Sequence, residues 1–317
     1  MLRVTCVLLG LLAIVPFVTV EGAIAQQKVE EERSAEATAA LAKANQLSQE
    51  AFQLYREGKS QIAIPLEQEA LQLREKYLGS SHLDVATSLI GLAELYRTEY
   101  RYEEAEVLIQ RGLIIRENQL GADHLDVAQG LNNLAVIYED QDRYGEAESL
   151  LKRNLKILER QLGINHLRVA LTLNNLAGIY QDQGRHQEAE PLIQRSLRIR
   201  ENQLGTGHLD VAQSLNNLAE VYQTQGRYEE AEPLFQRSLK IREDQLGANH
   251  LKVANGIGSL ASLYQAQGRH EEAELLFQRS LKIREDKLGS DHSRVLRILC
   301  KGSRIQIEQR RDPNGTT

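Results

Sequence analysis

The sequence predicts an all-α solenoid, a stack of helix–turn–helix units in which each unit packs on the next. One observation is direct repetition, because HLDVAQGLNNLA from His124 to Ala135 returns as HLDVAQSLNNLA from His208 to Ala219. A second is that each such stretch carries apolar residues at helical spacing. The third is a fixed step of 42 residues, which is a period typical of repeat arrays. This step separates the histidines His82, His124, His166, His208, His250 and His292, and also the tyrosines Tyr96, Tyr138, Tyr180, Tyr222 and Tyr264.

The first 25 residues have the features of an export signal. Arg3 precedes an uncharged apolar run from Val4 to Val20, and Ala23-Ile24-Ala25 offers the small-x-small pattern that signal peptidases cleave. We therefore expect residues 1–25 to be removed and the protein to be exported, to a periplasmic, envelope or secreted location. The alternative is an uncleaved helix that anchors the chain, because 17 apolar residues lie at the short end of what spans a bilayer.

The rest of the chain divides by its repeats. Residues 26–39 form a charged, alanine-rich lead-in, and residues 40–291 are predicted to form the repeat array. A helix over residues 292–311 has one apolar and one basic side, as expected of a cap on the last repeat. Residues 312–317 are predicted to be a disordered tail. The array contains one divergent repeat and then five clear ones, which begin at His82, His124, His166, His208 and His250.

Each clear repeat is predicted to contain two helices, as the repeat that starts at His124 illustrates. Val127 and Leu131 share one face of its first helix, and small Ala135 and Ala147 allow the two helices to approach closely. Neither helix can bury its apolar stripe alone. Stacking on the neighbouring repeats is therefore obligatory.

Particular residues mark the expected helix ends. Gly184, Gly226 and Gly268 lie where first helices must end, because glycine adopts the left-handed capping conformation without strain, and Gly163 closes a second helix in the same way. Residues just before the repeat histidine, such as Asp123 and Asn165, are expected to cap the next first helix.

Composition excludes several classes of function. The net charge of −6 gives no electrostatic footprint for nucleic acid, and the chain has no glycine-rich phosphate loop or paired-cysteine metal motif. With Cys6 inside the predicted signal, Cys300 is the only cysteine left, so no intrachain disulfide is expected. One histidine per repeat cannot converge on a metal ion. We expect no cofactor and, because no nucleophile–base pair stands out, no enzyme.

The repeat as a whole resembles a known family. The pattern G-x-x-H-L-D-V-A-x-x-L-N-N-L-A, followed by Y, G-R-Y-x-E-A-E-P-L and R-x-L-x-I-R-E-x-x-L-G, is similar to the 42-residue tetratricopeptide repeat of kinesin light chains. The resemblance covers about residues 40 to 300. It implies a right-handed superhelix whose inner groove, lined by first helices, binds extended peptides. Those light chains carry a long heptad coiled coil before the repeats, and this chain shows no heptads there, so a motor subunit is not expected as a partner.

A second stripe lies opposite the packed face of each first helix, and it contains no Lys or Arg. An idle solvated face would usually include several. Two readings remain open: the amides pack against neighbouring repeats, or they present donors and acceptors to the backbone of an extended peptide. The candidate peptide-binding residues are Gln129, Asn132, Asn133, Asp140, Asn174, Asn175, Asp182, Gln213, Asn216, Asn217 and Glu220.

The charge of this stripe predicts the kind of partner. Glu94, Asp140, Asp182 and Glu220 make it acidic, and no basic residue within the stripe offsets them. A neutral or basic peptide or protein is therefore expected rather than an acidic one. The sequence predicts a non-catalytic binding scaffold that docks an extended segment along the asparagine-rich concave face. The alternative is a structural part that braces an envelope complex through its outer faces.

Overall fold

The computed structural model describes residues 20–289, which form twelve α-helices and no β-strand. The predicted apolar run of the signal, the capping helix at 292–311 with Cys300, and the tail lie outside the described residues. The predicted cleavage motif at residues 23–25 falls inside the first helix. The helices divide into two compact units, residues 20–99 and 100–289, and each unit is described by itself.

The first unit contains α1 (Val20–Arg56), α2 (Ser60–Leu78) and α3 (Leu83–Thr98). Helix α1 has 37 residues, so it runs without a break through the predicted lead-in and into the start of the predicted array. It packs on α2 through fully buried small residues, Ala44 on α1 with Ala63 and Ala70 on α2, which allow the two helix axes to come close.

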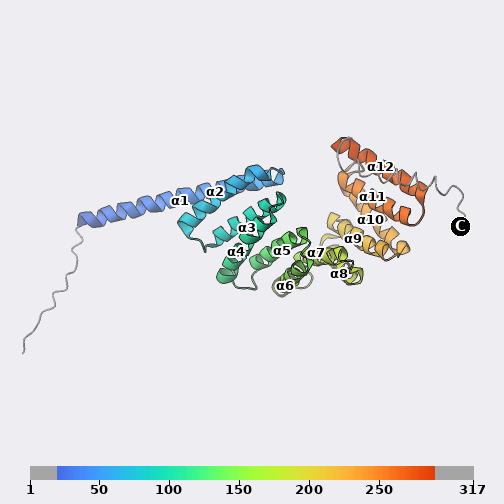
Figure 1. Ribbon diagram of the computed structural model, residues 1–317, viewed down its shortest axis with the longest axis horizontal. Helices are drawn as coiled ribbons and strands as arrows, with labels where there is room; N and C mark the ends of the chain where they lie inside the picture. Colours follow the sequence, from blue (N-terminus) through green and yellow to red (C-terminus); the bar gives the residue numbers. More distant parts are fainter. Residues whose placement is uncertain (1–19, 290–317) are drawn as a thin grey trace, which may run out of the picture. The chain divides into compact units, whose positions relative to one another are not determined.

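The second unit consists of nine helices, α4 to α12, which follow one another with short connections (Figure 1). Each first helix has 16 residues and each second helix has 19. The helices are α4 (Tyr102–Leu120), α5 (Leu125–Asp140), α6 (Tyr144–Leu162), α7 (Leu167–Asp182), α8 (His186–Leu204), α9 (Leu209–Thr224), α10 (Tyr228–Leu246), α11 (Leu251–Ala266) and α12 (His270–Leu288). The prediction of two helices per repeat is confirmed.

Small residues hold the two helices of a repeat together, as the spacing of the alanines predicted. Ala135 and Ala147 are 1% and 0% exposed. In the next repeats a buried serine on the second helix donates to a backbone carbonyl of the first, as Ser196 Oγ does to Ala170 O at 2.7 Å and Ser238 Oγ to Ala212 O at 2.6 Å. Each of these contacts needs the close approach that small side chains permit.

The helix ends confirm the glycine caps of the first helices and correct the other caps. Gly184 has φ of 72°, in the left-handed region that glycine adopts without strain. Gly163 has φ of 85° but ψ of 157°, an extended positive-φ conformation that is almost exclusive to glycine and differs from the predicted left-handed cap. The N-cap, however, is the repeat histidine itself: His124 Nδ1 accepts from the backbone N–H of Asp126 at 3.1 Å. Asp123, which we expected to cap this helix, pairs with Arg160 of α6 instead. An imidazole nitrogen with a free lone pair supplies the acceptor that a carboxylate would.

A cluster of four side chains, here called the latch, joins successive repeats. In one copy Arg185 stacks on the ring of Tyr180 and pairs with Glu188 at 2.8 Å, and Glu148 of α6 accepts from both Arg185 at 2.6 Å and Tyr180 Oη at 3.1 Å. The same arrangement recurs around Arg143 and Arg269. Around Arg227 the cation–π contact and the pair with Glu190 recur, but Tyr222 Oη accepts from Gln194 instead. The latch fixes each first helix and the following loop against the previous second helix.

First helices of neighbouring repeats lie closer together than second helices do. Two short side chains, Asn132 on α5 and Asn175 on α7, reach each other directly. Second helices are bridged by ion pairs between long side chains instead, such as Arg195 with Glu159 at 2.7 Å and Arg237 with Glu201 at 2.6 Å. The first helices therefore line the inner side of the second unit. Among the helices of residues 20–289, none combines the length and apolar character needed to span a bilayer.

Candidate functional site

The predicted stripe lies on α5, α7 and α9 of the second unit, and we call it the amide stripe. Its eleven residues differ in exposure. Four are exposed, five are half-buried, and Asn174 and Asn216 are buried at 9% and 6% exposure. The exposed members are Gln129, Asp140, Asp182 and Gln213, and the half-buried ones are Asn132, Asn133, Asn175, Asn217 and Glu220.

One pair of asparagines serves packing between repeats. Asn175 Nδ2 donates to Asn132 Oδ1 at 3.0 Å and so connects α7 to α5. For these two residues, the hypothesis that the stripe amides pack against neighbouring repeats is therefore the one that applies. Asn133, the neighbour of Asn132, stays half-buried and makes no such contact with α7 within the described part of the chain.

On α9 the amides bind within their own helix. Gln213 Nε2 donates to Asn217 Oδ1, and Asn216 Nδ2 donates to Glu220 Oε1, both at 2.7 Å. The side-chain oxygens of Asn174 and Asn216 are buried and have no hydrogen-bond partner. A buried acceptor without a donor costs about 1–3 kcal/mol, so these two oxygens are unfavourable positions in the folded state.

Beneath the stripe the structure places a row of buried arginines that the sequence analysis missed. They belong to the second helices and are each 7% exposed: Arg116, Arg200, Arg242 and Arg284. Leu158 interrupts the row at the equivalent position of α6. The signal in the sequence is the Ile-Arg-Glu triplet at the 42-residue step, but spacing along a second helix does not show that its arginine extends under a first helix.

These guanidiniums bind to first helices. Arg200 Nη1 donates to Asp210 O at 3.0 Å and to Ser214 Oγ at 2.8 Å, and Arg242 Nη2 donates to Gln213 Oε1 of the stripe at 3.4 Å. Arg116 donates to Asp126 O at 2.7 Å. The hydrogen bonds of these three arginines thus go to protein acceptors on first helices.

The charges of the site have both signs, which corrects the premise that nothing basic lies near the acidic residues. Burial lowers the pKa of Arg116, Arg200 and Arg242, and none of the three forms an ion pair with a carboxylate of residues 20–289. Burial also raises the pKa of Glu220. The hydrogen bond from Asn216 and the charge of Arg242 lower this pKa and offset part of the increase. The carboxylates lie at the stripe itself and the guanidiniums lie below it.

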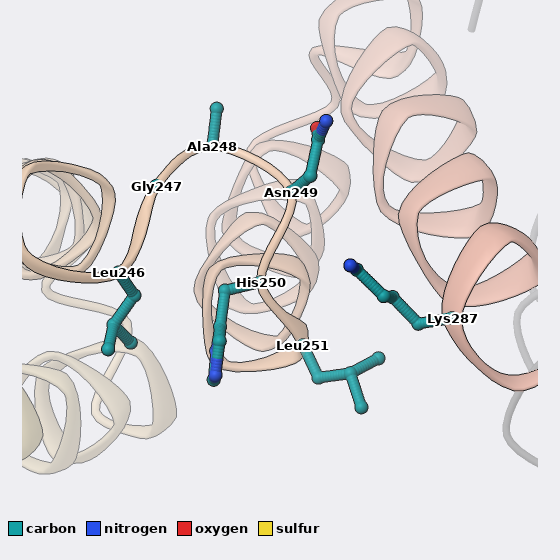
Figure 2. A pocket seen from close by; sticks show the side chains of 7 residues that line it. All are labelled: Leu246, Gly247, Ala248, Asn249, His250, Leu251 and Lys287. Atoms are coloured by element: carbon teal, nitrogen blue, oxygen red, sulfur yellow. The ribbon is translucent and has the colours of Figure 1, made fainter.

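Shallow hollows at the loops between repeats are a second kind of concavity. One, of about 450 Å³, is lined by the loop from Leu246 to Leu251 with Lys287 at its side (Figure 2). A matching hollow of about 430 Å³ lies two repeats earlier, between Leu162 and Leu167, with Gln203 in place of Lys287. Because the side residue changes while the loop backbone stays, we attribute these hollows to the repeat geometry.

Titratable side chains do not gather into a metal centre in the described residues, where no group of three or more His, Cys, Asp or Glu has suitable geometry. The repeat histidines are occupied as helix caps, for example His208 with the N–H of Asp210 at 3.1 Å. The arrangement offers hydrogen-bond donors and acceptors along a line, which suits recognition of a chain more than chemistry on a small molecule.

The arrangement of paired helices defines a helical-repeat solenoid. The tetratricopeptide repeat family matches residues 44–118, 99–160, 126–202, 168–244 and 210–286. The chain belongs to this family, whose repeats generally serve as non-catalytic scaffolds that bind proteins or peptides.

Solved structures give the same fold. BtubC (BKLC) from P. vanneervenii is 22% identical, with a TM-score of 0.59 over 80% of this chain and 92% of that chain. A protein of Podosopora anserina classed as a kinesin light chain, with nearly identical TPR-like repeats, is 26% identical, with a TM-score of 0.57 over 65% of this chain and 98% of that chain. PilF of Pseudomonas aeruginosa is 16% identical, with a TM-score of 0.56 over 85% and 99%. A search among curated protein sequences finds no match.

Proposed function

We propose that the protein is a non-catalytic scaffold that docks an extended segment of a partner along the amide stripe. The observation that carries this proposal is the row of amide side chains on consecutive first helices, with no Lys or Arg among them. Asn133 and Asn217 remain half-buried at the inner side, with donor groups left for a ligand. Amides both donate and accept, as peptide groups do, so they match a backbone of any sequence.

The expected affinity is modest. Packed helices lie about 8–10 Å apart, so first helices of successive repeats are separated by roughly twice that distance. A chain that advances ~3.3 Å per residue passes several residues at each repeat. Each hydrogen bond contributes about 0.5–1.5 kcal/mol, and the ordering of the segment offsets much of that. Micromolar dissociation constants are expected.

A neutral or basic segment fits the stripe better than an acidic one. Asp140 and Asp182 are exposed at the level where a ligand would lie, whereas the arginines are 7% exposed and bind protein acceptors. The ligand therefore meets the carboxylates first, and like charges at close range are unfavourable.

Binding of a peptide array to the full chain tests this function. The variant Asn133→Ala with Asn217→Ala removes two half-buried stripe amides but spares the pair between Asn132 and Asn175. The matched control is Asn118→Ala with Asn202→Ala, which removes two exposed asparagines from second helices. We expect at least a tenfold loss of affinity in the first variant and none in the control. Equal loss in both, or in neither, excludes the stripe as the docking face.

We also propose that the protein is exported, on the strength of the residues that precede the array. Cell fractionation with N-terminal sequencing of the mature chain tests this, and a chain that starts at Gln26 is expected. Material that retains Arg3 in the membrane fraction would support the anchored alternative instead.

Bracing of an envelope complex through the outer faces is the second candidate. Val107 and Ile114 are 65% and 58% exposed and lie seven residues apart on α4, so they share one side of that helix. The stripe variant distinguishes the two functions, since an outer-face brace would survive the loss of Asn133 and Asn217.

A further inference from the structure

Arg200 lacks a hydrogen-bond acceptor that equivalent buried arginines have. On three other second helices the arginine donates from Nη2 to a side-chain oxygen of the preceding helix, 29 residues earlier in the chain. The pairs are Arg74 with Asn45 Oδ1 at 2.9 Å, Arg242 with Gln213 Oε1 at 3.4 Å and Arg284 with Asn255 Oδ1 at 3.0 Å. The residue 29 positions before Arg200 is Leu171, which has no acceptor atom in its side chain.

The remaining contacts of Arg200 show that its guanidinium lies in the same place as that of Arg242. Arg200 Nη1 donates to Asp210 O, ten residues later, as Arg242 Nη1 does to Lys252 O. Since Nη1 holds the same place in both repeats, Nη2, the other arm of the planar guanidinium, is directed to the residue 29 positions earlier. For Arg200 that residue is Leu171 of the stripe on α7.

The second arm of Arg200 is recessed but open. Both printed hydrogen bonds of this side chain come from Nη1, so within residues 20–289 Nη2 has no acceptor. The residue is 7% exposed, and Nη2 is not sealed from solvent, unlike the side-chain oxygens of Asn174 and Asn216. A recessed charged donor without an acceptor is costly, and an oxygen of a ligand can reach this one.

Leu171 gives the same place an apolar contact surface. It is 49% exposed, whereas the equivalent residues of α5 and α9 are the candidate peptide-binding residues Gln129 and Gln213. An exposed leucine gains from contact with methylene groups, because both apolar surfaces leave water. The α7 position therefore combines an apolar surface with an unused charged donor.

The start of α7 is also less acidic than the starts of the neighbouring first helices. Arg168 stands where α5 has Asp126 and α9 has Asp210, and the first turn of α7 contains no acidic residue. Asp182 is the last residue of α7, about 16 Å along the helix axis from Leu171. A ligand oxygen near Leu171, neutral or charged, therefore meets no carboxylate of α7.

We propose that Leu171 and Nη2 of Arg200 form a subsite for one glutamine or glutamate side chain of the docked segment. The inference rests on the proposed function and adds a chemical preference at one position. The methylene groups of this side chain contact Leu171, and its terminal oxygen accepts from the guanidinium, as Gln213 Oε1 does from Arg242 in the next repeat. The ligand thus supplies the acceptor that α7 lacks, in a hydrogen bond strengthened by the charge of the donor.

Selection from a display library of random short peptides, on the full chain, tests this subsite. Wild type, Leu171→Gln and Leu275→Gln are compared. Leu171→Gln gives Arg200 an internal acceptor of the kind that Arg242 has. Leu275→Gln is the matched control, because Leu275 is an exposed leucine of α12 outside the stripe. The affinity of one selected peptide is then measured with its Gln or Glu and with Leu in that place.

We expect peptides selected by the wild type and by Leu275→Gln to share one Gln or Glu, and this preference to be lost in Leu171→Gln. Replacing that residue with Leu should weaken binding about tenfold to the wild type and leave binding to Leu171→Gln unchanged. Peptides that depend on Asn133 and Asn217 but show no such preference, or keep it in Leu171→Gln, overturn the subsite and leave the proposed function intact. A selection that recovers no peptide dependent on those asparagines contradicts the proposed function itself.

Discussion

The guanidinium of Arg185 lies over the ring of Tyr180, with 4.0 Å from its central carbon to the ring centroid, and Nη1 is 2.6 Å from Glu148 Oε2 of the preceding repeat. One side chain thus connects a first helix, the loop after it and the previous second helix. The stack of arginine on tyrosine and the pair with the preceding glutamate recur four times in the second unit.

Replacement of Arg185 with alanine should destabilise the second unit by about 1–2 kcal/mol. The change removes a cation–π contact, worth roughly 0.5–2 kcal/mol, and leaves Glu148 with Lys152 as its remaining cation. The pair with Glu188 is exposed and adds little. Chemical denaturation measures the loss, and Arg198→Ala, an exposed arginine on α8, is the control that should change stability by less than about 0.5 kcal/mol.

Glu148 makes the stability of the protein depend on acid pH. Its hydrogen bonds with Arg185, and then with Lys152 and Tyr180, hold its pKa at about 2 against the usual 4.5. A carboxyl with a depressed pKa in the folded state stabilises that state above its unfolded pKa, and the stabilisation is lost as pH falls from about 5 to about 2. Glu148→Gln should flatten the free energy of unfolding across this range. Glu229→Gln, an exposed residue of α10, should retain the wild-type slope.

The histidine caps can be exchanged for ordinary capping residues. His208 Nδ1 accepts from the N–H of Asp210 at 3.1 Å, so His208→Ala should cost about 0.5–2 kcal/mol, whereas His208→Asn restores an acceptor at the same place and should recover most of it. Thermal denaturation of the two variants compares them. Equal melting temperatures for alanine and asparagine would mean that the imidazole does not act as a cap.

Tyr100 is a position where substitution should stabilise the protein. It has φ of 61° at the place where other repeats have Gly184, Gly226 and Gly268. The left-handed conformation costs a residue with a side chain roughly 1–2 kcal/mol, and the edge contact with Tyr102 offsets part of it. We expect Tyr100→Gly to raise the free energy of unfolding by about 1 kcal/mol. The converse change, Gly184→Ala, should lower it by a similar amount.

The sequence predicted the fold well because the 42-residue step shows which residues occupy equivalent positions in successive repeats. Two helices per repeat, the close alanines Ala135 and Ala147 and the glycine ends follow from helical spacing and backbone preference, which are local properties. The histidine cap was missed because Asp123 and His124 are both able to accept, and the choice depends on the competing contact of Asp123 with Arg160.

The site was predicted less completely, for a reason that lies in side-chain reach. Helical spacing places Asn132 of α5 and Asn175 of α7 on the inner side of their own helices, but it does not show that the two side chains bind each other across repeats. Nor does it show that Arg200, from a second helix, extends under a first helix to Asp210 and Ser214. Contacts between elements depend on interhelical distance, which the sequence pattern of a single helix does not contain.

Each latch connects only one repeat and its immediate neighbour, and this affects how such a chain can change in evolution. Duplication or loss of one 42-residue module leaves every remaining junction with the partners it needs, as the near identity of the stretches at His124 and His208 illustrates. Whole modules can therefore be gained or lost by recombination, and the length of the array then changes in steps of one repeat.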